Sequence, residues 1–387
     1  MLIKFFLSKK FENKKIIKDK NKKIIKIFKK VLNEKSEILK SLGKNYSYNF
    51  TKKQLKKYKS FKNYRIIGMG GSILGTQAIY DFLKHKINKK ILFINNLINK
   101  QEKEKIKFTN LIVSKSGNTI ETIINLNILI KKNDNNIFIT ENKKSYLQLL
   151  AKKLKGEIIH HNNFIGGRFS VLSEVGMLPA ELMGLKSNDF RQLNSLIKNK
   201  KFLNALVQNV SSTLNFIKYK KLNSIIINYD AKSENLFKWY QQLIAESLGK
   251  HNKGLLPIIS SMPKDNHSLM QLYLDGPKKS FFTFFNVEEK SEKLNKFIID
   301  KSFLNLKNKS LYEIIDAQKK ATQIVFKKQK IPFRSFKIIK RNENTLGGLF
   351  CFFMLEVVLL SKALKVNPLD QPAVELIKNE TKKILIK

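Results

Sequence analysis

Short apolar runs that end in a glycine or a polar turn alternate with helical stretches along most of this chain. Residues 64–67 form the first such run, which ends at Gly68, and a helical stretch follows at 74–84. Further strand candidates lie at 91–94, 111–113, 137–139 and 158–159, with helical stretches at 120–130 and 145–154. Parallel strands need a crossover connection, which is usually a helix. The alternation therefore predicts an α/β fold built on a parallel sheet.

The same alternation starts again in the second half of the chain. Strands are expected at 224–228, 281–285 and 335–339, and helices at 236–248, about 290–302, 310–328, 345–364 and from Pro372 onward. Residues 1–60 are lysine-rich, and their apolar residues recur at helical spacing around 24–32. We therefore expect an N-terminal helical extension at 1–60, a first α/β domain at 61–185 and a second at 190–387.

The charge of the chain is strongly positive. Lys and Arg total 75 against 30 acidic residues, which gives a formal net charge of +45. Such a balance is typical of nucleic-acid binders. Only five of these basic residues are Arg, however, and Arg provides the bidentate geometry with which proteins recognise nucleic-acid bases and phosphates. Lys, Asn and Ile are enriched together along the whole length, which favours a bias toward A/T-rich codons. A DNA affinity that survives moderate salt would favour the nucleic-acid alternative.

Cysteine content and hydropathy limit the class of protein further. The one cysteine, Cys351, excludes an intramolecular disulfide framework and a cysteine-cluster metal site, and it favours a cytoplasmic location. The most apolar stretch, 349–360, contains Glu356 and is shorter than the ~20 residues that a membrane crossing needs. The N-terminus lacks the uninterrupted apolar region of a signal peptide. We expect no membrane association.

Two loops, each after a predicted strand and before a helix, are suited to an anion. Gly68-Met69-Gly70-Gly71-Ser72 combines close backbone approach with a hydroxyl donor at a helix start. Ser114-Lys115-Ser116-Gly117-Asn118-Thr119 places three hydroxyls within six residues, and Asn118 with Glu121 is expected to form a capping pair. A sugar phosphate fits these loops better than ATP, because an acidic pair for magnesium is missing nearby. The alternative is a pair of ordinary strand-to-helix turns.

Two further motifs suggest chemistry beside the phosphate. Gly166-Gly167-Arg168 retains one of the five arginines directly after two glycines, which indicates that its planar fork matters. Gln242 and Glu246 are four residues apart, so they share a face of a helix that is otherwise rich in bulky apolar residues. Glu246 is therefore a candidate general base. The alternatives are a turn arginine and an exposed helix carboxylate.

The last two motifs are weaker when each is taken alone. His267 stands in a polar loop, where a surface role is the ordinary one for a histidine. Gln371 and Lys378 are seven residues apart on a helix that Pro372 starts, so both can point to one place. Lys378 is otherwise an ordinary solvated lysine.

Together, the six motifs resemble the glucose-6-phosphate isomerase (phosphoglucose isomerase) family. All six segments occur in the family's order, and the five strongest matches are G-M-G-G-S-x-L-G, S-K-S-G-N-T-x-E-T, G-G-R-F-S-V-L-S, Q-x-x-x-E-S-x-G-K and D-Q-x-x-V-E-x-x-K. The resemblance implies two sugar isomerase (SIS) domains, each an α/β/α sandwich with a parallel sheet. Asn266 and Ala373 depart from the family's usual residues, Gln and Gly.

The resemblance also implies roles for individual residues. The phosphate and substrate loops would contain Gly71, Ser72, Ser114, Lys115, Ser116 and Thr119. Arg168 and Gly167 would lie at the reacting carbons, Glu246 would be the base and Gln242 a substrate contact. His267 and Lys378 would assist ring opening, and Gln371 would contact phosphate or sugar. In the family the histidine comes from the neighbouring subunit, so a homodimer with shared sites is implied.

The implied reaction interconverts glucose 6-phosphate and fructose 6-phosphate through an enediolate, with neither a cofactor nor a metal. Three alternatives remain at this point. A non-catalytic sugar-phosphate sensor would keep the phosphate loops without needing Glu246, Arg168 and Lys378. A nucleic-acid binder rests on the charge alone. An isomerase that also accepts mannose 6-phosphate is the nearest alternative among enzymes.

Overall fold

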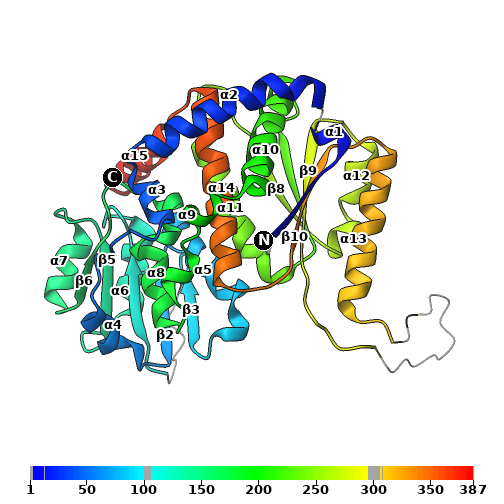
Figure 1. Cartoon of the computed structure of the whole chain (residues 1–387). Coiled ribbons are helices and arrows are strands. Elements are labelled where there is room, and N and C mark those ends of the chain that lie inside the picture. The colour runs from blue at the N-terminus through cyan, green and yellow to red at the C-terminus, as the bar shows by residue number, and fades with distance from the viewer. Residues whose placement is uncertain (1–2, 13, 100–105, 295–305, 307, 387) are drawn as a thin grey trace.

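The fold contains two five-stranded sheets that lie in separate lobes of the molecule (Figure 1). It comes from a computed structural model, which describes residues 3–12, 14–99, 106–294, 306 and 308–386. Each sheet is covered by helices, as the alternation of strands and helices in the sequence predicts. The α/β fold class is therefore confirmed.

The first sheet has the order β3-β2-β4-β5-β6, and all of its strand pairs are parallel. Its strands are β2 (Asn63–Gly68), β3 (Lys90–Ile94), β4 (Thr109–Val113), β5 (Asn135–Thr140) and β6 (Glu157–His160). Its helices are η1 (Gly70–Ser72), α5 (Leu74–Phe82), η2 (Lys84–Lys86), α6 (Ile120–Leu129), α7 (Tyr146–Lys153), η3 (Gly167–Leu172) and α8 (Glu174–Leu182). Gly68 pairs with Val113, so the loops after β2 and β4 are neighbours at one edge.

The second sheet has the order β1-β10-β9-β7-β8. Its parallel strands are β7 (Asn223–Asn228), β8 (Leu256–Ser261), β9 (Ser280–Val287) and β10 (Phe333–Ile338). Its helices are η4 (Ser187–Phe190), α9 (Leu193–Leu196), α10 (Lys200–Lys218), η5 (Ala231–Ser233), α11 (Glu234–Leu248), η6 (Lys264–His267), α12 (Met270–Asp275), α13 (Leu311–Lys328), α14 (Glu343–Leu364) and α15 (Pro372–Ile386).

The N-terminal segment differs from the purely helical extension that the sequence predicts. It begins with strand β1 (Ile3–Leu7), which pairs antiparallel with β10, and continues as α1 (Lys9–Glu12), α2 (Lys14–Asn33), α3 (Glu37–Leu42) and α4 (Lys52–Lys59). The β1 residues alternate between more and less buried positions, which is the period of a strand. Its partner lies more than 300 residues away, so local periodicity cannot reveal the pairing.

Two other elements differ from the prediction: strand β8 and the helix expected at about 290–302. Strand β8 was not predicted, because Pro257 and two terminal serines weaken its strand pattern. The position of β8 at the sheet edge explains why a proline is tolerated there. The helix expected at about 290–302 falls largely at 295–305, outside the described residues, and 290–294 is not helical.

Helix α14 runs through the middle of the molecule and forms much of its core (Figure 1). By length and composition it is the one described helix that could cross a membrane, but 89% of its most apolar window is buried inside the protein. Its acidic residue Glu356 is 1% exposed and pairs with Arg334 at 2.6 Å. Tyr240 also donates a hydrogen bond to this carboxylate at 2.9 Å. The buried charge is therefore fully compensated within the fold.

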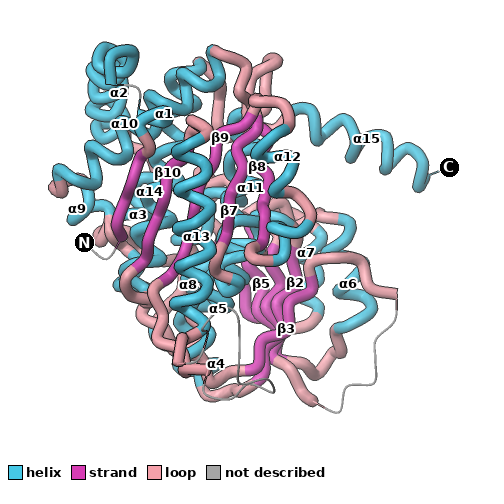
Figure 2. The backbone as a smooth tube through the Cα atoms, turned by 90° about the vertical axis from the view of Figure 1, so that its right-hand side faces the viewer, coloured by secondary structure: helices cyan, strands magenta, loops and turns pink. Residues whose placement is uncertain are grey.

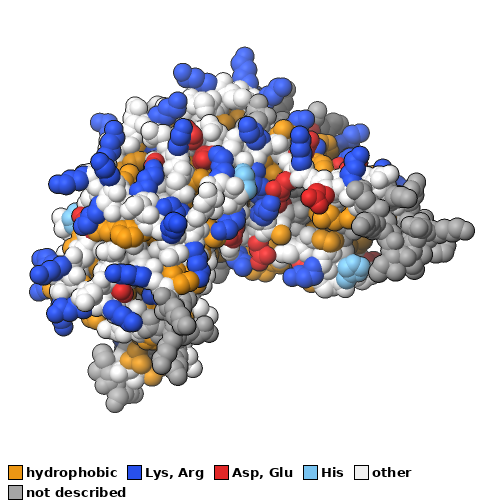
Figure 3. Space-filling view, turned by 90° about the horizontal axis from the view of Figure 1, so that it is seen from below, with side chains coloured by type: hydrophobic (Ala, Val, Ile, Leu, Met, Phe, Trp, Pro, Cys, Tyr) orange, Lys and Arg blue, Asp and Glu red, His pale blue; other side chains and the backbone are white. Residues whose placement is uncertain are grey.

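Arginine and lysine are used in different places in this protein. All five arginines are buried, with exposed fractions between 1% and 8%: Arg65, Arg168, Arg191, Arg334 and Arg341. Lysine side chains are instead spread over the face shown in Figure 3, without a single stripe. The retained arginines thus hold internal polar groups, while lysine supplies the surface charge.

Candidate active site

The two predicted anion loops lie side by side at the carboxyl ends of β2 and β4. The register that joins Gly68 to Val113 brings Ser72, in η1, next to the loop that starts at Ser114. Ser114 is buried, and its Oγ lies 2.9 Å from the Oγ1 of Thr119 at the start of α6. Ser116 is exposed at the turn, and its Oγ accepts a hydrogen bond from the Asn118 amide. The hydroxyls are therefore gathered at one helix start.

The shape of the second loop depends on Gly117. Its φ is +67°, and a Cβ there would lie 2.2 Å from the Oγ of Ser145, so only glycine fits. The turn directs Asn118 toward α7, where its Oδ1 accepts from the Tyr146 amide at 2.9 Å. The expected Asn118–Glu121 capping pair is therefore wrong, and Thr119 stands at the N-cap of α6 without a side-chain cap.

Lys115 extends from the same loop toward neighbouring polar groups. Its Nζ lies 3.2 Å from Glu141 Oε1 and donates to the carbonyl of Asn163 at 2.9 Å. Its side chain is 31% exposed, so it stays accessible to an anion at the loop.

A close backbone contact joins the phosphate loops to Arg168. A Cβ on Gly71 would lie 2.3 Å from the carbonyl carbon of Gly167, so η1 and η3 touch through their glycines. Ser170 Oγ adds a hydrogen bond to the Gly71 carbonyl at 3.4 Å. Position 71 therefore requires glycine, because a side chain there would push the hydroxyl loop away from the backbone of Gly167 and Arg168, whereas a Cβ on Gly167 would meet Gly71 only at 3.7 Å.

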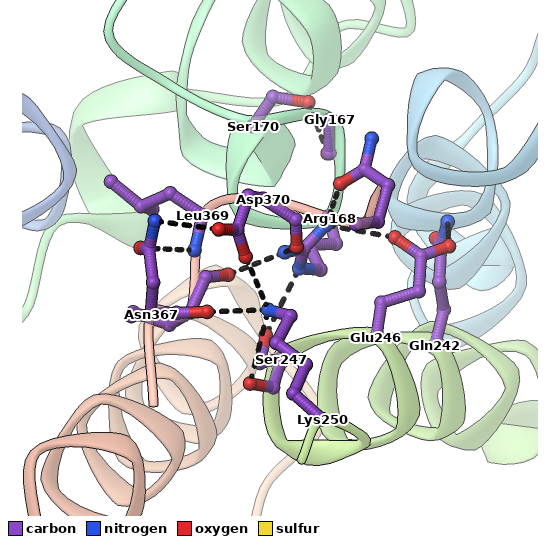
Figure 4. A network of polar contacts seen from close by, with 12 residues as sticks. Gly167, Arg168, Ser170, Gln242, Glu246, Ser247, Lys250, Asn367, Leu369 and Asp370 are labelled. Carbon is purple, nitrogen blue, oxygen red and sulfur yellow. Dashed lines mark hydrogen bonds and ion pairs between the residues drawn. The ribbon is translucent and has the colours of Figure 1, made fainter. Parts of the chain in front are cut away.

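Arg168 is 3% exposed and uses all five of its N–H donors (Figure 4). Nε donates to Ser247 Oγ at 3.0 Å, and Nη1 donates to Glu246 Oε2 at 2.8 Å and to Gln371 Oε1 at 2.7 Å. Nη2 donates to the carbonyls of Pro368 and Asp370. Burial lowers the pKa of Arg168 from its usual value, and the Glu246 carboxylate opposes that shift. The guanidinium thus joins α11 to the segment that precedes α15.

Glu246 and Gln242 share one face of α11, as their spacing predicts. Gln242 Nε2 donates to Glu246 Oε1 at 2.8 Å, and the other carboxylate oxygen accepts from Arg168. The Glu246 side chain is 31% exposed, so one side of the carboxylate faces solvent. Gln242 Oε1 is buried and has no hydrogen-bond partner among the described residues. A carboxylate with fixed orientation and a free amide oxygen therefore lie one helical turn apart.

A cavity of about 790 Å³ opens beside these residues, with walls that include Glu246, Lys250, Asp370 and Gln371. A second hollow, of about 1050 Å³, lies between β1 and α10 and contains none of the predicted site residues. We take the smaller cavity as the relevant one, because it adjoins the paired charges of Arg168 and Glu246.

His267 lies away from Glu246 within one chain. Glu246 is near the end of α11, where Gln241 Nε2 bonds the carbonyl of Pro257 at the start of β8. His267 follows the other end of β8, in η6, and is exposed. Six residues of strand span about 20 Å. The structure therefore does not bring His267 to the other site residues of its own chain.

Lys378 also lies outside the cluster. It stands on α15, which projects away from the rest of the molecule (Figure 2), and its Nζ pairs with Glu375 at 2.7 Å. Gln371, just before this helix, does reach Arg168. Of the C-terminal pair, the structure therefore places only Gln371 at the site.

Several residues around Arg168 were not predicted. Ser247 and Asp370, which contact Arg168, and Lys250, which contacts both of them, belong to the Q-x-x-x-E-S-x-G-K and D-Q motifs, but the sequence gave no reason to assign them a role. Trp239 Nε1 donates to the Arg168 carbonyl at 3.1 Å. Within the described residues, no group of three or more His, Cys, Asp or Glu side chains is placed to hold a metal ion.

Comparison with known proteins decides the family. The sequence model of phosphoglucose isomerase matches residues 12–255. The chain belongs to the phosphoglucose isomerase family. Glucose-6-phosphate isomerase of Methanocaldococcus jannaschii is 34% identical over 353 residues, which cover 85% of this chain and 86% of the relative. The enzyme of the same name from Mycoplasmopsis pulmonis is 33% identical over 358 residues, or 83% of this chain and 82% of the relative.

Solved structures support the fold of this family member. A hypothetical protein from Thermus thermophilus superposes with a TM-score of 0.87 at 20% identity, over 99% of this chain and all of that one. A glucose-6-phosphate isomerase from Chlamydia trachomatis superposes with a TM-score of 0.70 at 19% identity, over 86% of this chain and 71% of that one. At these identities the likeness concerns the fold alone.

Proposed function

We propose that this chain interconverts glucose 6-phosphate and fructose 6-phosphate through an enediolate. The observation that carries the proposal is the pairing of Glu246 with Arg168 at 2.8 Å, beside the hydroxyl loops. An aldose–ketose isomerisation moves a proton from carbon 2 to carbon 1, so it needs one base and one cation near the reacting oxygens. Names of relatives that share the family and most of the chain length support the same substrate pair.

The two helix-start loops supply the phosphate site in this proposal. Ser72, Ser114, Lys115, Ser116 and Thr119 lie together at the carboxyl ends of β2 and β4. A phosphate there is held by hydroxyls, an ammonium group and helix N–H groups. Because η1 contacts η3 through Gly71 and Gly167, the bound phosphate fixes the sugar relative to Arg168.

Glu246 is the proposed base, and Arg168 stabilises the charge of the enediolate. All five Arg168 donors already have acceptors, so a substrate oxygen enters by exchange with one of them. The Gln371 side chain is the acceptor that can rotate away. The unpartnered Oε1 of Gln242 is available to a substrate hydroxyl. The oxidation of carbon 2 is balanced by the reduction of carbon 1 in the same substrate molecule, so the proposed reaction uses no redox cofactor.

We further propose a homodimer in which His267 completes the site of the neighbouring subunit. The separation of His267 from Glu246 along β8 supports this, since one chain alone does not join them. Helix α15 exposes four large apolar side chains, each at least 67% accessible, which suit a subunit contact: Leu376, Ile377, Ile384 and Leu385. Lys378, on the same helix, would reach a site when α15 packs. The division into domains at 61–185 and 190–387 and a cytoplasmic location belong to the same proposal.

A coupled assay tests the proposed function directly. Purified protein is given fructose 6-phosphate, and formation of glucose 6-phosphate is followed through a dehydrogenase that reduces NADP. Turnover abolished in Glu246→Gln supports the proposal. Binding of the sugar phosphate without any turnover would instead favour a non-catalytic sensor. Mannose 6-phosphate as a second substrate measures the breadth of the isomerase.

A further inference from the structure

Lys250 is unusually buried for a lysine of this chain. Its side chain is 8% exposed, although it follows the end of α11 in a surface turn. Nζ forms an ion pair with Asp370 Oδ1 at 3.0 Å and donates to the carbonyls of Asn367 and Ser247. A buried ammonium group with three oxygen partners indicates that this lysine holds a specific part of the structure, unlike the solvated lysines of the surface.

Two of the three partners of Lys250, Asn367 and Asp370, lie on the linker, residues 365–371, which connects α14 to α15. Asp370 Oδ2 accepts from Asn367 Nδ2 at 3.0 Å, and Asn367 Oδ1 accepts from the Leu369 amide at 3.0 Å. Lys250 therefore closes a ring of polar contacts that gives the linker one shape (Figure 4). The Lys250 contact also holds the pKa of Asp370 below its usual range, so the carboxylate stays charged at neutral pH.

The same linker supplies three of the five acceptors of Arg168. These are the carbonyls of Pro368 and Asp370 and the side chain of Gln371. Lys250 and Arg168 thus both bind the linker. Ser247 connects them, since its Oγ accepts from Arg168 and its carbonyl accepts from Lys250. A shift of the linker would move Arg168, because its fork is rigid and its hydrogen bonds are directional.

We propose that Lys250 is a positioning residue of the active site, which acts through its ion pair with Asp370. It fixes the linker so that the guanidinium of Arg168 lies at the correct angle to Glu246. The side-chain nitrogen of Lys250 contacts neither Glu246, the proposed base, nor Arg168, the proposed cation. Its role is therefore to orient other groups, and its kinetic consequences rest on the proposed function.

Kinetics of Lys250→Met, Asp370→Asn and the double variant test this role. Methionine keeps the length of the buried stem, and Asp370 is 52% exposed, so Asp370→Asn should fold normally. We expect kcat to fall roughly 10- to 100-fold in each single variant, because small misplacements of a catalytic group have costs of this size. KM should change less than threefold, since other loops hold the phosphate. The double variant should be no worse than the poorer single one.

Lys319→Met is the matched control. Lys319 lies on α13 and is also a buried lysine in an ion pair: its side chain is 6% exposed, and its Nζ contacts Asp316 at 2.6 Å and Asn286 at 3.0 Å, away from the linker. It should keep kcat within about twofold of the unmodified chain. Equal losses in Lys250→Met and Lys319→Met, or additive effects in the double variant, would overturn the inference.

Hydrogen exchange gives a readout that does not depend on isomerase activity. Amides at 365–371 should exchange at least tenfold faster in Lys250→Met than in the unmodified chain, and Lys319→Met should leave them unchanged. Equal exchange in all three proteins would overturn the positioning role, whatever reaction the protein performs. If the unmodified chain did not isomerise the sugar phosphate, that result would contradict the proposed function but not the role of Lys250 in fixing the linker.

Discussion

Replacing Arg168 by lysine tests whether the planar fork, and not the charge alone, supports the reaction. Arg168 uses five donors on five acceptors, whereas a lysine offers three donors from one nitrogen. At least two acceptors must lose their partner. The lost bonds should be those to the carbonyls of Pro368 and Asp370, where water can replace the donor because the linker is largely exposed. Stability should therefore fall by only about 1–2 kcal/mol.

Activity should fall much further in Arg168→Lys. The ammonium keeps its attraction to Glu246 but cannot hold that carboxylate and a substrate oxygen in the geometry of the fork. Removal of one well-placed donor at a developing charge typically lowers kcat by about 10²–10³-fold. We expect this loss in the coupled assay, with a smaller change in KM.

Arg191→Lys is the matched control for that experiment. Arg191 is 1% exposed and bonds the Tyr48 hydroxyl and the carbonyls of Ser41, Gly43 and Leu172, apart from the proposed reacting groups. Its three carbonyl acceptors belong to buried residues, so the control should lose more stability and less turnover than Arg168→Lys. If both variants lost turnover equally, or if Arg168→Lys stayed near full activity, the argument from the fork would be refuted.

Two further predictions concern the dimer and the dependence of stability on pH. Inactive His267→Ala and Glu246→Gln proteins should regain part of their activity when mixed, because a mixed dimer contains one intact shared site; no recovery after proven subunit exchange would count against sharing. Burial lowers the pKa of His161 to about 4, below the ~6.5 of the unfolded chain, so the unfolded state gains a proton first as pH falls. The free energy of unfolding, measured in urea, should therefore fall by up to about 3 kcal/mol between pH 6.5 and 4 because of this group. This fall should disappear in His161→Asn and persist in the control His160→Asn, since His160 is exposed.

The sequence predicted the parallel strands well because each is a buried apolar run with a local boundary. Gly68 and the loop after Val113 marked two strand ends, and the parallel order then placed both loops at one edge. Strand β1 was missed because its pairing with β10 is a long-range contact. Strand β8 was missed because Pro257 is acceptable only at an edge, and the sheet order could not be read from local patterns.

At the site, helical spacing predicted the pairing of Gln242 with Glu246, since both lie on one helix face. The contacts between Arg168 and the linker could not be predicted, because they join residues about 200 positions apart through backbone carbonyls. Every residue has a backbone carbonyl, so the residue type does not indicate which carbonyl accepts a hydrogen bond. The roles of His267 and Lys378 stay predictions, since they depend on a second subunit.

Exchange of the carbon 2 hydrogen in Glu246→Gln tests the central claim most directly. Glutamine can still accept from Arg168, and its amide can donate to Oε1 of Gln242 once the Gln242 amide, whose Nε2 faces Glu246, turns over, so fold and binding should persist. The variant lacks only the ability to take a proton. Glucose 6-phosphate deuterated at carbon 2 should therefore lose its label to water at least about 10²–10⁴-fold more slowly with the variant, while its affinity for sugar phosphate stays within about threefold. Label loss at the rate of the unmodified protein would show that the base is elsewhere and would contradict the mechanism.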